Sequence, residues 1–212
     1  MENFIYAKKN AISSELCNEF IENYKKDLTL DTKDRLSSPA EIDGEIKPNI
    51  KLSTDIGFNF HHPGWEEHEF GPLLKTFIPI LKENLNTYIT KYLLQISNNG
   101  DGTRTFTYSQ NPNETDIAPI FNFQHYKPGE GFYDWHNERS SSEYANRVLV
   151  WMVFLNDIKN GGGTEFYHQK HTEKPEQGKM LIFSSEFIHT HRGQIAPSEN
   201  KYILTGWWGF NK

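Results

Sequence analysis

Two stretches in the first half of the chain place apolar residues three and four positions apart, which is the spacing of an amphipathic helix. The first stretch follows Ser13 and Ser14, both suitable N-cap residues, and the second predicts a longer helix over residues 72–94. Between them, apolar and polar residues alternate over residues 50–60, as they do in a half-buried strand. Residues 31–49 follow neither period, so we expect a mobile loop there.

The second half of the chain consists of short strand-like runs separated by turns rich in Pro, Gly and Asn. Many short strands at regular spacing predict a sandwich or barrel, of which the jelly roll is one form. We therefore predict a mainly β (α+β) single domain over residues 1–212, with mainly helical support and an early strand in 1–95 and the β core in 96–212. The predicted strands are 104–108, 120–126, 147–155, 164–168, 180–184, 189–193 and 202–208.

Composition excludes several classes of protein. The single cysteine, Cys17, excludes an internal disulfide and a cysteine-based zinc or iron–sulfur site. A net charge of −6 disfavours a nucleic-acid binder that works by general neutralisation of phosphates. The chain has neither an apolar run of membrane-spanning length nor a signal-peptide pattern at its start, so we expect a cytoplasmic protein that does not contact membranes.

Three histidines and one glutamate carry the most informative chemistry. His136 and Glu138 are two positions apart, so in an extended segment both side chains point to the same side. A histidine about fifty residues later, His189 or His191, would complete a set of two histidines and one carboxylate. Such a set binds one face of a metal and leaves other coordination positions open, as in non-haem Fe(II) oxygenases. The His-x-Glu pattern by itself occurs more often in an exposed loop than at a metal site.

Two further features suit a ligand cavity. Lys201 begins an otherwise apolar strand, where it is either a surface residue or an anchor for the carboxylate of a dicarboxylic acid. On an earlier strand, Asn122, Gln124 and Tyr126 share one face, while apolar residues occupy much of the other. A polar face on a core strand is typical of a cavity lining.

Four other residues each have two interpretations. Arg147 and Arg192 either bind substrate or co-substrate, or form structural ion pairs. Trp207 and Trp208 point to opposite faces of the last strand, so at most one of them can contact the cavity.

Together these residues resemble the 2-oxoglutarate and Fe(II)-dependent dioxygenases, specifically the prolyl 4-hydroxylase-like branch of that family. The resemblance extends over roughly residues 120–208. The matching segments are Tyr126-Lys127-Pro128-Gly129, His136-Asn137-Glu138, Arg147, Phe154-Leu155-Asn156-Asp157, Gly162-Gly163-Thr164-Glu165-Phe166, Pro175-Glu176-Gln177-Gly178 with Phe183, and His191 with Lys201 ten positions later.

The resemblance implies a double-stranded β-helix, or jelly roll, with Fe(II) held by His136, Glu138 and His191. It also implies that 2-oxoglutarate and O2 are co-substrates and that Lys201, together with Tyr126, binds the distal carboxylate of 2-oxoglutarate. His136, Glu138 and His191 are therefore the predicted catalytic residues.

The sequence departs from the family pattern at two places. Glu138 stands where the family has Asp, and the interval from Tyr126 to His136 is about one residue longer than usual. The ten-residue spacing to Lys201 favours His191 over His189 as the third ligand.

The activity implied by the resemblance is hydroxylation of a C–H bond, foremost C4 of a peptidyl proline, with release of succinate and CO2 and with ascorbate as a reductant. The partner would then be a proline-containing peptide or protein. The alternatives are an oxygenase acting on a lysyl residue, a free amino acid or another small molecule, and a non-catalytic metal-binding jelly-roll module. The oligomeric state is not determined by the sequence alone.

Overall fold

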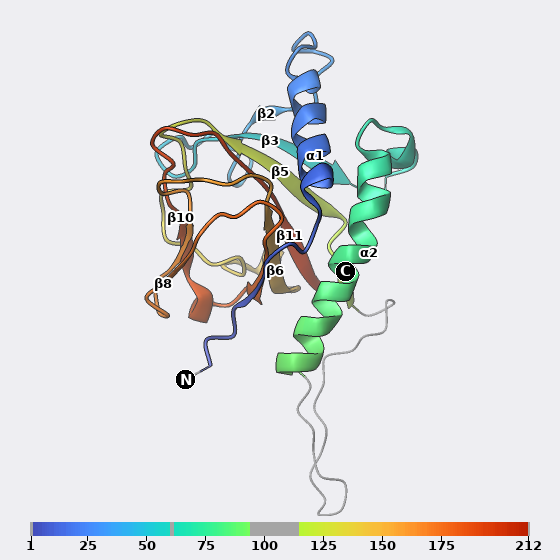
Figure 1. Cartoon of the computed structure of the whole chain (residues 1–212). Helices are drawn as coiled ribbons and strands as arrows, with labels where there is room; N and C mark the ends of the chain where they lie inside the picture. The colour runs from blue at the N-terminus through green and yellow to red at the C-terminus, as the bar shows by residue number, and fades with distance from the viewer. Residues whose placement is uncertain (1, 60–61, 94–114, 212) are drawn as a thin grey trace, which may run out of the picture.

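A computed structural model of the chain describes residues 2–59, 62–93 and 115–211. A main β-sheet lies between a pair of helices on one side and a smaller sheet on the other (Figure 1). The helices are α1 (Ser14–Asp27) and α2 (Gly71–Tyr88), and α2 continues into a short π-helical segment, Ile89–Leu93.

The strands of both sheets pair in an antiparallel manner throughout the described residues. The main sheet has the order β1-β9-β6-β11-β5-β3-β2 with β4 paired to β11, and the smaller sheet has the order β10-β7-β8. Two such sheets with N-terminal helices outside them confirm the predicted mainly β, jelly-roll fold. The strands are β1 (Tyr6–Lys8), β2 (Ser38–Pro39), β3 (Thr54–Asn59), β4 (Thr115–Ile117), β5 (Ile120–Tyr126), β6 (Arg147–Phe154), β7 (Thr164–Phe166), β8 (His171–Glu173), β9 (Met180–Ser184), β10 (His191–Gly193) and β11 (Lys201–Phe210).

The two faces of the main sheet have different partners. On the helix side, Phe121 and Phe123 of β5 and Leu204 and Trp208 of β11 join one apolar core with α1 and α2. On the other side, Ile203 belongs to a second apolar cluster between the sheets. The predicted alternation along β5 is thereby confirmed, because its two phenylalanines are fully buried against the helices.

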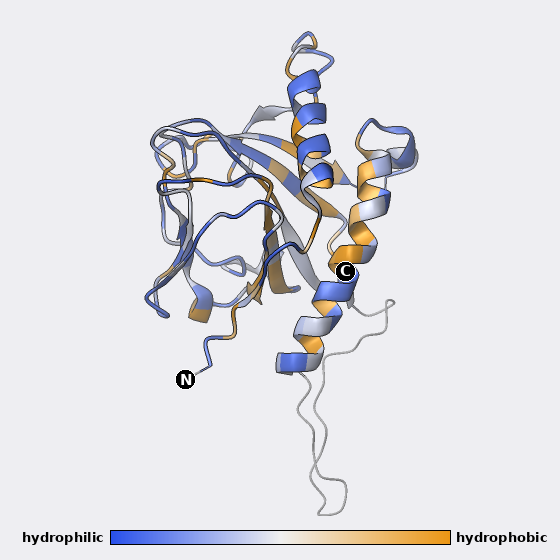
Figure 2. Ribbon diagram, in the orientation of Figure 1, coloured by the Kyte–Doolittle hydropathy of each residue, from blue (hydrophilic) through white to orange (hydrophobic). Residues whose placement is uncertain are grey.

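Helix α1 begins where the sequence predicts it. The Ser13 side chain accepts a hydrogen bond from the backbone N–H of Leu16 at 3.2 Å and so caps the first turn. Both helices alternate apolar and polar residues along their length (Figure 2). Their apolar residues pack on the main sheet, since burying such a face accounts for most of the stability of a helix of this kind.

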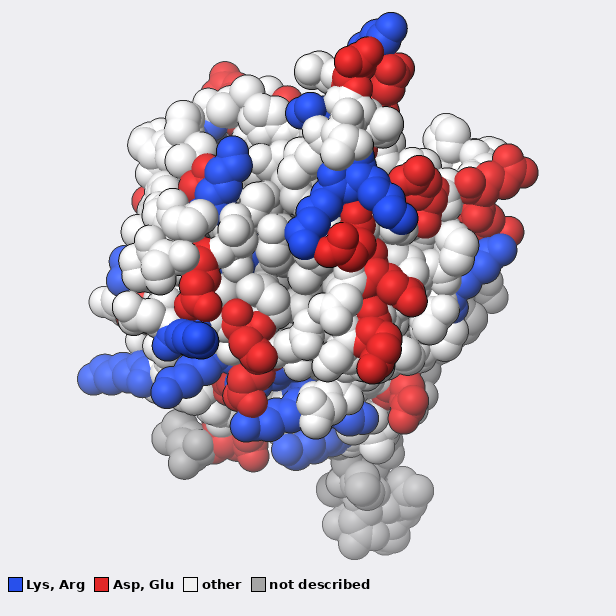
Figure 3. Space-filling view, turned by 45° about the horizontal axis from the view of Figure 1, so that its top comes forward, with Lys and Arg blue, Asp and Glu red and all other residues white. Residues whose placement is uncertain are grey.

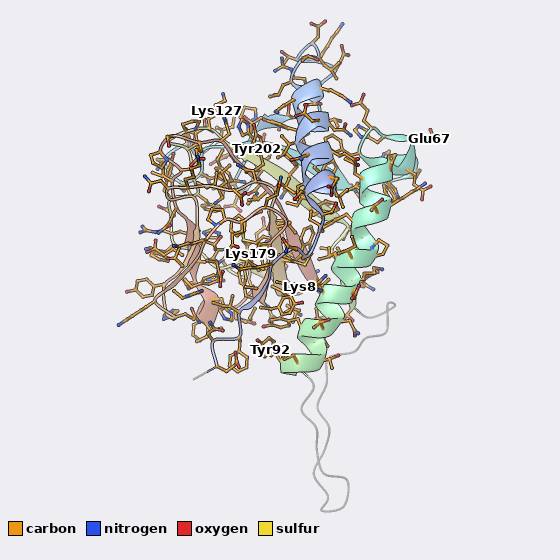
Figure 4. The ribbon with its side chains drawn as sticks, in the orientation of Figure 1. Lys8, Glu67, Tyr92, Lys127, Lys179 and Tyr202 are labelled. Carbon is orange, nitrogen blue, oxygen red and sulfur yellow. The ribbon has the colours of Figure 1, made fainter. Side chains whose placement is uncertain are left out.

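A buried polar network ties α1 to the sheet. Tyr24 stacks on Phe123 at 4.8 Å and its hydroxyl lies 2.9 Å from His125 Nδ1, while His125 Nε2 lies 2.8 Å from Asn200 Oδ1. Burial lowers the pKa of His125, so the ring is neutral, donates from Nε2 and accepts from Tyr24. Tyr202 of β11 stacks on the His125 ring and lies beside α1 (Figure 4).

The structure differs from the predicted strands in several places. Residues 50–52 pair with the 131–133 segment rather than with β5, so β3 starts at Thr54 instead of continuing the predicted strand over 50–60. The predicted strand 189–193 starts at His191, because the three residues before Thr190 form a 3-10 helix.

Other differences come from elements too short to show a period. Strands β1, β4 and β8 have three residues each and were not predicted, and the predicted loop 31–49 contributes the two-residue strand β2. The predicted strand 104–108 lies outside the described residues, and the division into one domain stays a prediction.

Charged side chains of both signs are interspersed on the face displayed in Figure 3. That face therefore lacks the continuous basic surface that general binding to a phosphate backbone would need. Among the helices that the structure describes, none is both long and apolar enough to cross a bilayer.

We expect Gly206→Ala to destabilise the fold. Gly206 lies opposite Trp151 in the main sheet, and a Cβ atom there would come within 2.6 Å of both Phe121 Cβ and Trp151 Cζ2. Overpacking of this kind lowers the free energy of unfolding by about 1–3 kcal/mol. Urea denaturation measures the change. Gly57→Ala is the matched control, because the nearest atom to its Cβ is Asn122 Oδ1 at 3.6 Å. Equal unfolding midpoints for the two variants would contradict this account.

Candidate active site

The extended segment after β5 is joined to β10 by a pair of backbone hydrogen bonds. The His136 N–H donates to the His191 carbonyl at 3.0 Å, and the His191 N–H donates to the His136 carbonyl at 2.9 Å. Two residues on, the Glu138 N–H donates to the Ser185 carbonyl at 3.1 Å. These bonds keep the segment extended, so His136 and Glu138 face the same side, towards His191.

His136, Glu138 and His191 form a cluster whose ligand atoms lie within 4.8 Å of one another. Glu138 Oε1 is 3.5 Å from His136 Nε2 and 3.8 Å from His191 Nε2. Two atoms that each bind one ion at about 2.1 Å must lie within about 4.2 Å of each other. Both carboxylate–imidazole distances meet that limit, so Glu138 can share one ion with either histidine, and two histidines with one carboxylate are a donor set suited to a metal.

The tautomer of each histidine in the cluster follows from its backbone partner. His136 Nδ1 lies 2.9 Å from the Asp134 carbonyl, and His191 Nδ1 lies 2.9 Å from the His189 carbonyl. A carbonyl only accepts, so Nδ1 carries the proton and each Nε2 presents its lone pair to the cluster. Metal-binding histidines are oriented in this way. The Phe132 ring stacks on His136 at 3.7 Å and further restricts its rotation.

The protonation states also suit metal binding. Burial opposes ionisation of Glu138, but the neighbouring His136, His191 and Arg147 outweigh it and lower the pKa of Glu138 to about 2. Burial and the neighbouring His136 lower the pKa of His191 to about 3. At neutral pH the cluster therefore offers an ionised carboxylate and a neutral imidazole.

The cluster lies in a cavity of about 340 Å³ between the two sheets. Gln124, Tyr126 and Lys201 line it from the main sheet, and Thr164 and His191 line it from the smaller sheet. The predicted polar face of β5 is therefore a cavity lining. This size is within the range of cavities that hold small organic ligands.

Lys201 is buried in this cavity, and none of the described carboxylates balances its charge. Its side chain faces the rings of Tyr126 at 5.4 Å and Phe154 at 5.8 Å, and no carboxylate in the described residues forms an ion pair with it. Burial alone lowers the pKa of Lys201 to about 8. A buried, unpaired cation in a cavity indicates a site for an anionic ligand.

Two neighbours of Lys201 have partners within the protein. The Tyr126 hydroxyl donates to Gln124 Oε1 at 2.7 Å, so its proton is directed at that amide. Lys51 lines the same cavity, but its Nζ lies 2.6 Å from Asp55 Oδ2, which neutralises it.

His189 lies outside the cluster. Its Nδ1 accepts a hydrogen bond from the Ser184 N–H at 3.2 Å, and its Nε2 donates to the Asn3 carbonyl at 2.9 Å. Both nitrogens are used in these bonds, which tie the N-terminal segment to the end of β9. The structure thus places His191, and not His189, with His136 and Glu138.

Part of the chain matches a known protein family. Residues 121–209 match the model of the 2OG-Fe(II) oxygenase superfamily, and this segment contains the whole cluster and Lys201. This segment of the chain is similar to 2OG-Fe(II) oxygenases. A search of curated proteins finds no matching relative.

Solved structures of prolyl hydroxylases share the fold of this chain. A viral collagen prolyl hydroxylase from Paramecium Bursaria Chlorella virus-1, in its 2OG complex, superposes with a TM-score of 0.62 at 18% identity, over 97% of this chain and 95% of that one. A prolyl-4-hydroxylase of Pseudomonas putida has a TM-score of 0.63 at 16% identity, over 97% and 92% of the two chains.

A third relative was solved with a peptide. The prolyl hydroxylase of Trichoplax adhaerens, in complex with a fragment of the hypoxia inducible factor oxygen degradation domain, has a TM-score of 0.63 at 16% identity, over 98% of this chain and 84% of that one. The predicted resemblance to prolyl 4-hydroxylase-like 2-oxoglutarate/Fe(II)-dependent dioxygenases is confirmed, and the superfamily implies Fe(II) and 2-oxoglutarate as its cofactor and co-substrate.

The structure also decides between the two interpretations of the arginines and tryptophans. Arg192 forms an ion pair with Glu165 at 2.9 Å on the outer side of the smaller sheet. Arg147 lines the cavity and lies 3.3 Å from Glu138 Oε2. Trp207 lines the cavity while Trp208 is in the helix-side core, as the alternation requires.

Sequence reasoning did not connect Arg147 and Trp207 with the metal-binding cluster. The available signal was the period of two along β11. Lys201, Ile203, Thr205 and Trp207 all line the cavity. Any residue an even number of positions from Lys201 on that strand was therefore a candidate for the site.

Replacement of one ligand at a time should separate His189 from the cluster. We expect His136→Gln, His191→Gln and Glu138→Gln to weaken Fe(II) binding by more than the roughly 10- to 100-fold that loss of an outer hydrogen-bond partner costs. His189→Gln, the matched control, should bind Fe(II) nearly as the unmodified protein does. Anaerobic calorimetric titration with Fe(II) measures the affinities. Strong binding by His191→Gln together with lost binding by His189→Gln would refute this assignment.

Proposed function

We propose that this oxygenase hydroxylates a peptidyl proline at C4, using 2-oxoglutarate and O2 and releasing succinate and CO2. The observation that carries the proposal is the buried, unpaired Lys201 in the same cavity as His136, Glu138 and His191. A metal-binding jelly roll without turnover would have no use for a dicarboxylate anchor there. One oxygen atom of O2 enters the proline and the other enters succinate, so the reaction balances.

The residues of the chain have separate roles in this proposal. His136, Glu138 and His191 hold Fe(II), which supplies the redox chemistry that activates O2 and couples it to decarboxylation of 2-oxoglutarate. Lys201 binds the distal carboxylate of 2-oxoglutarate through a charge-assisted hydrogen bond. Tyr126 forms one wall of this subsite, and its own hydrogen bond to Gln124 keeps its ring in place.

The proline substrate is supported by two observations of different kinds. The three prolyl hydroxylases above share the fold, and one of them was solved with a peptide fragment. The cavity of this chain carries the aromatic rings of Phe132, Tyr144 and Trp207 beside the metal-binding cluster. Aromatic surfaces suit proline-containing segments, which are already extended before they bind. A cytoplasmic location and a requirement for ascorbate stay predictions.

The pH dependence of 2-oxoglutarate binding should report on Lys201. The ammonium group is charged below its pKa of about 8 and neutral above it, so binding is strongest below that pH and weakens as pH rises. Above pH 8 we expect the apparent affinity for 2-oxoglutarate to fall by about tenfold per pH unit, since one proton is linked to binding. Titrations of 2-oxoglutarate between pH 7 and pH 10 measure this.

Two variants serve as controls for that titration. Lys201→Ala should weaken 2-oxoglutarate by about ten- to a hundredfold at pH 7 and leave Fe(II) affinity nearly unchanged. Lys201→Arg keeps its charge at every pH tested, so its affinity should not depend on pH in this range. Identical titration curves for the unmodified protein and Lys201→Ala would exclude Lys201 as the anchor.

A peptide library tests the substrate. Proline-containing peptides should gain one oxygen atom, in equal amount to the succinate formed, when Fe(II), 2-oxoglutarate and O2 are present. Mass spectrometry with fragmentation locates the oxygen. The controls are the same peptides with Ala in place of Pro, and the His136→Gln variant. If the added oxygen is found on a lysyl residue, lysine and not proline is the substrate. If no 2-oxoglutarate is consumed, the proposed enzymatic activity is refuted.

A further inference from the structure

The two carboxylate oxygens of Glu138 have different surroundings. Oε1 faces the cluster, at 3.5 Å from His136 Nε2 and 3.8 Å from His191 Nε2. Oε2 points away from it and accepts hydrogen bonds from Trp207 Nε1 at 3.1 Å and from Arg147 Nη1 at 3.3 Å. One oxygen is therefore directed at the metal-binding cluster, and the other is bound by two donors from β6 and β11.

Arg147 is itself fixed on three sides. Its guanidinium lies over the Trp207 ring at 3.5 Å and over the Tyr144 ring at 4.0 Å. Its Nη1 also donates to the Glu138 backbone carbonyl at 3.2 Å. The Arg147 and Glu138 side chains are each only 17% exposed, so water competes little for these bonds. The stacked rings thus leave the guanidinium a single orientation.

A glutamate at this position needs such restraint more than an aspartate does. Glutamate has one more rotatable bond, and a carboxylate can bind a metal through one or both of its oxygens. Binding through both would occupy a coordination position that 2-oxoglutarate and O2 require. Trp207 and Arg147 satisfy Oε2, so Oε1 alone is available to the ion.

We propose that Trp207 and Arg147 are positioning residues that hold Glu138 in a one-oxygen binding geometry and so allow a glutamate to serve in this site. The proposal rests on the proposed function only in so far as the cluster binds Fe(II). The indole N–H supplies orientation without charge, and the guanidinium supplies both charge and a second hydrogen bond.

A double-mutant cycle on Fe(II) affinity, measured without 2-oxoglutarate, tests the proposal. Trp207→Phe removes the N–H but keeps a ring against Arg147, and it should weaken Fe(II) binding by about 10- to 100-fold. Glu138→Asp shortens the side chain, so its carboxylate should no longer reach the indole and the cluster together. In that background, Trp207→Phe should change the affinity much less.

Trp135→Phe is the matched control. Its indole lies against Arg192 at 4.4 Å and Tyr167 at 5.1 Å, and it does not line the cavity. The same chemical change there should leave the Fe(II) affinity unaltered. Circular dichroism spectra and thermal melts show whether each variant is folded.

A second variant keeps the test valid if Trp207→Phe does not fold. Arg147→Lys retains the charge but loses the planar group that stacks between the two rings, so it should also weaken Fe(II) binding and should do so less in the Glu138→Asp background.

The outcomes separate this proposal from the proposed function. Unchanged affinity in Trp207→Phe, or an equal loss in both Glu138 backgrounds, would overturn the positioning role while the unmodified protein still binds Fe(II). No Fe(II) binding by the unmodified protein would overturn both.

Discussion

Side chains alternate along β11, and this one constraint connects the core of the molecule with its cavity. Leu204 and Trp208 point to the helices, while Lys201 and Trp207 point into the cavity. β11 also pairs with β4, β5 and β6. A shift of its register by one residue would therefore place Lys201 against the helices and an apolar residue in the cavity. Burial of the helix-side residues makes the observed register the most stable one.

The metal-binding cluster depends on the same geometry in a shorter segment. His136 and Glu138 share a face because the chain is extended there, and two backbone hydrogen bonds to His191 keep it extended. Because both imidazoles donate from Nδ1 to backbone carbonyls, their orientation is set by the backbone rather than by the ion. The backbone therefore brings the donor atoms of the cluster close together.

Charge pairing then distinguishes the cavity residues that are available to ligands from those that are not. Lys51 is neutralised by Asp55, while the nearby Lys201 has no carboxylate partner in the described part of the chain. A dianion such as 2-oxoglutarate would place one carboxylate on Lys201 and the other at the metal. The cost of burying Lys201 without a partner is offset only when such a ligand binds.

The sequence by itself determined the helices, most strands, and the shared face of His136 and Glu138. These follow from periods of two or 3.6 and from the spacing of chemically informative residues, which are local properties. The pairing of residues 50–52, the contacts of Trp207 with Glu138, and the hydrogen bonds that hold His189 outside the cluster were decided only by the tertiary structure. Each depends on which distant segment supplies a hydrogen-bond partner, and a local pattern does not specify that partner. The N-terminal segment, for example, binds His189 through the Asn3 carbonyl and so keeps that ring out of the site.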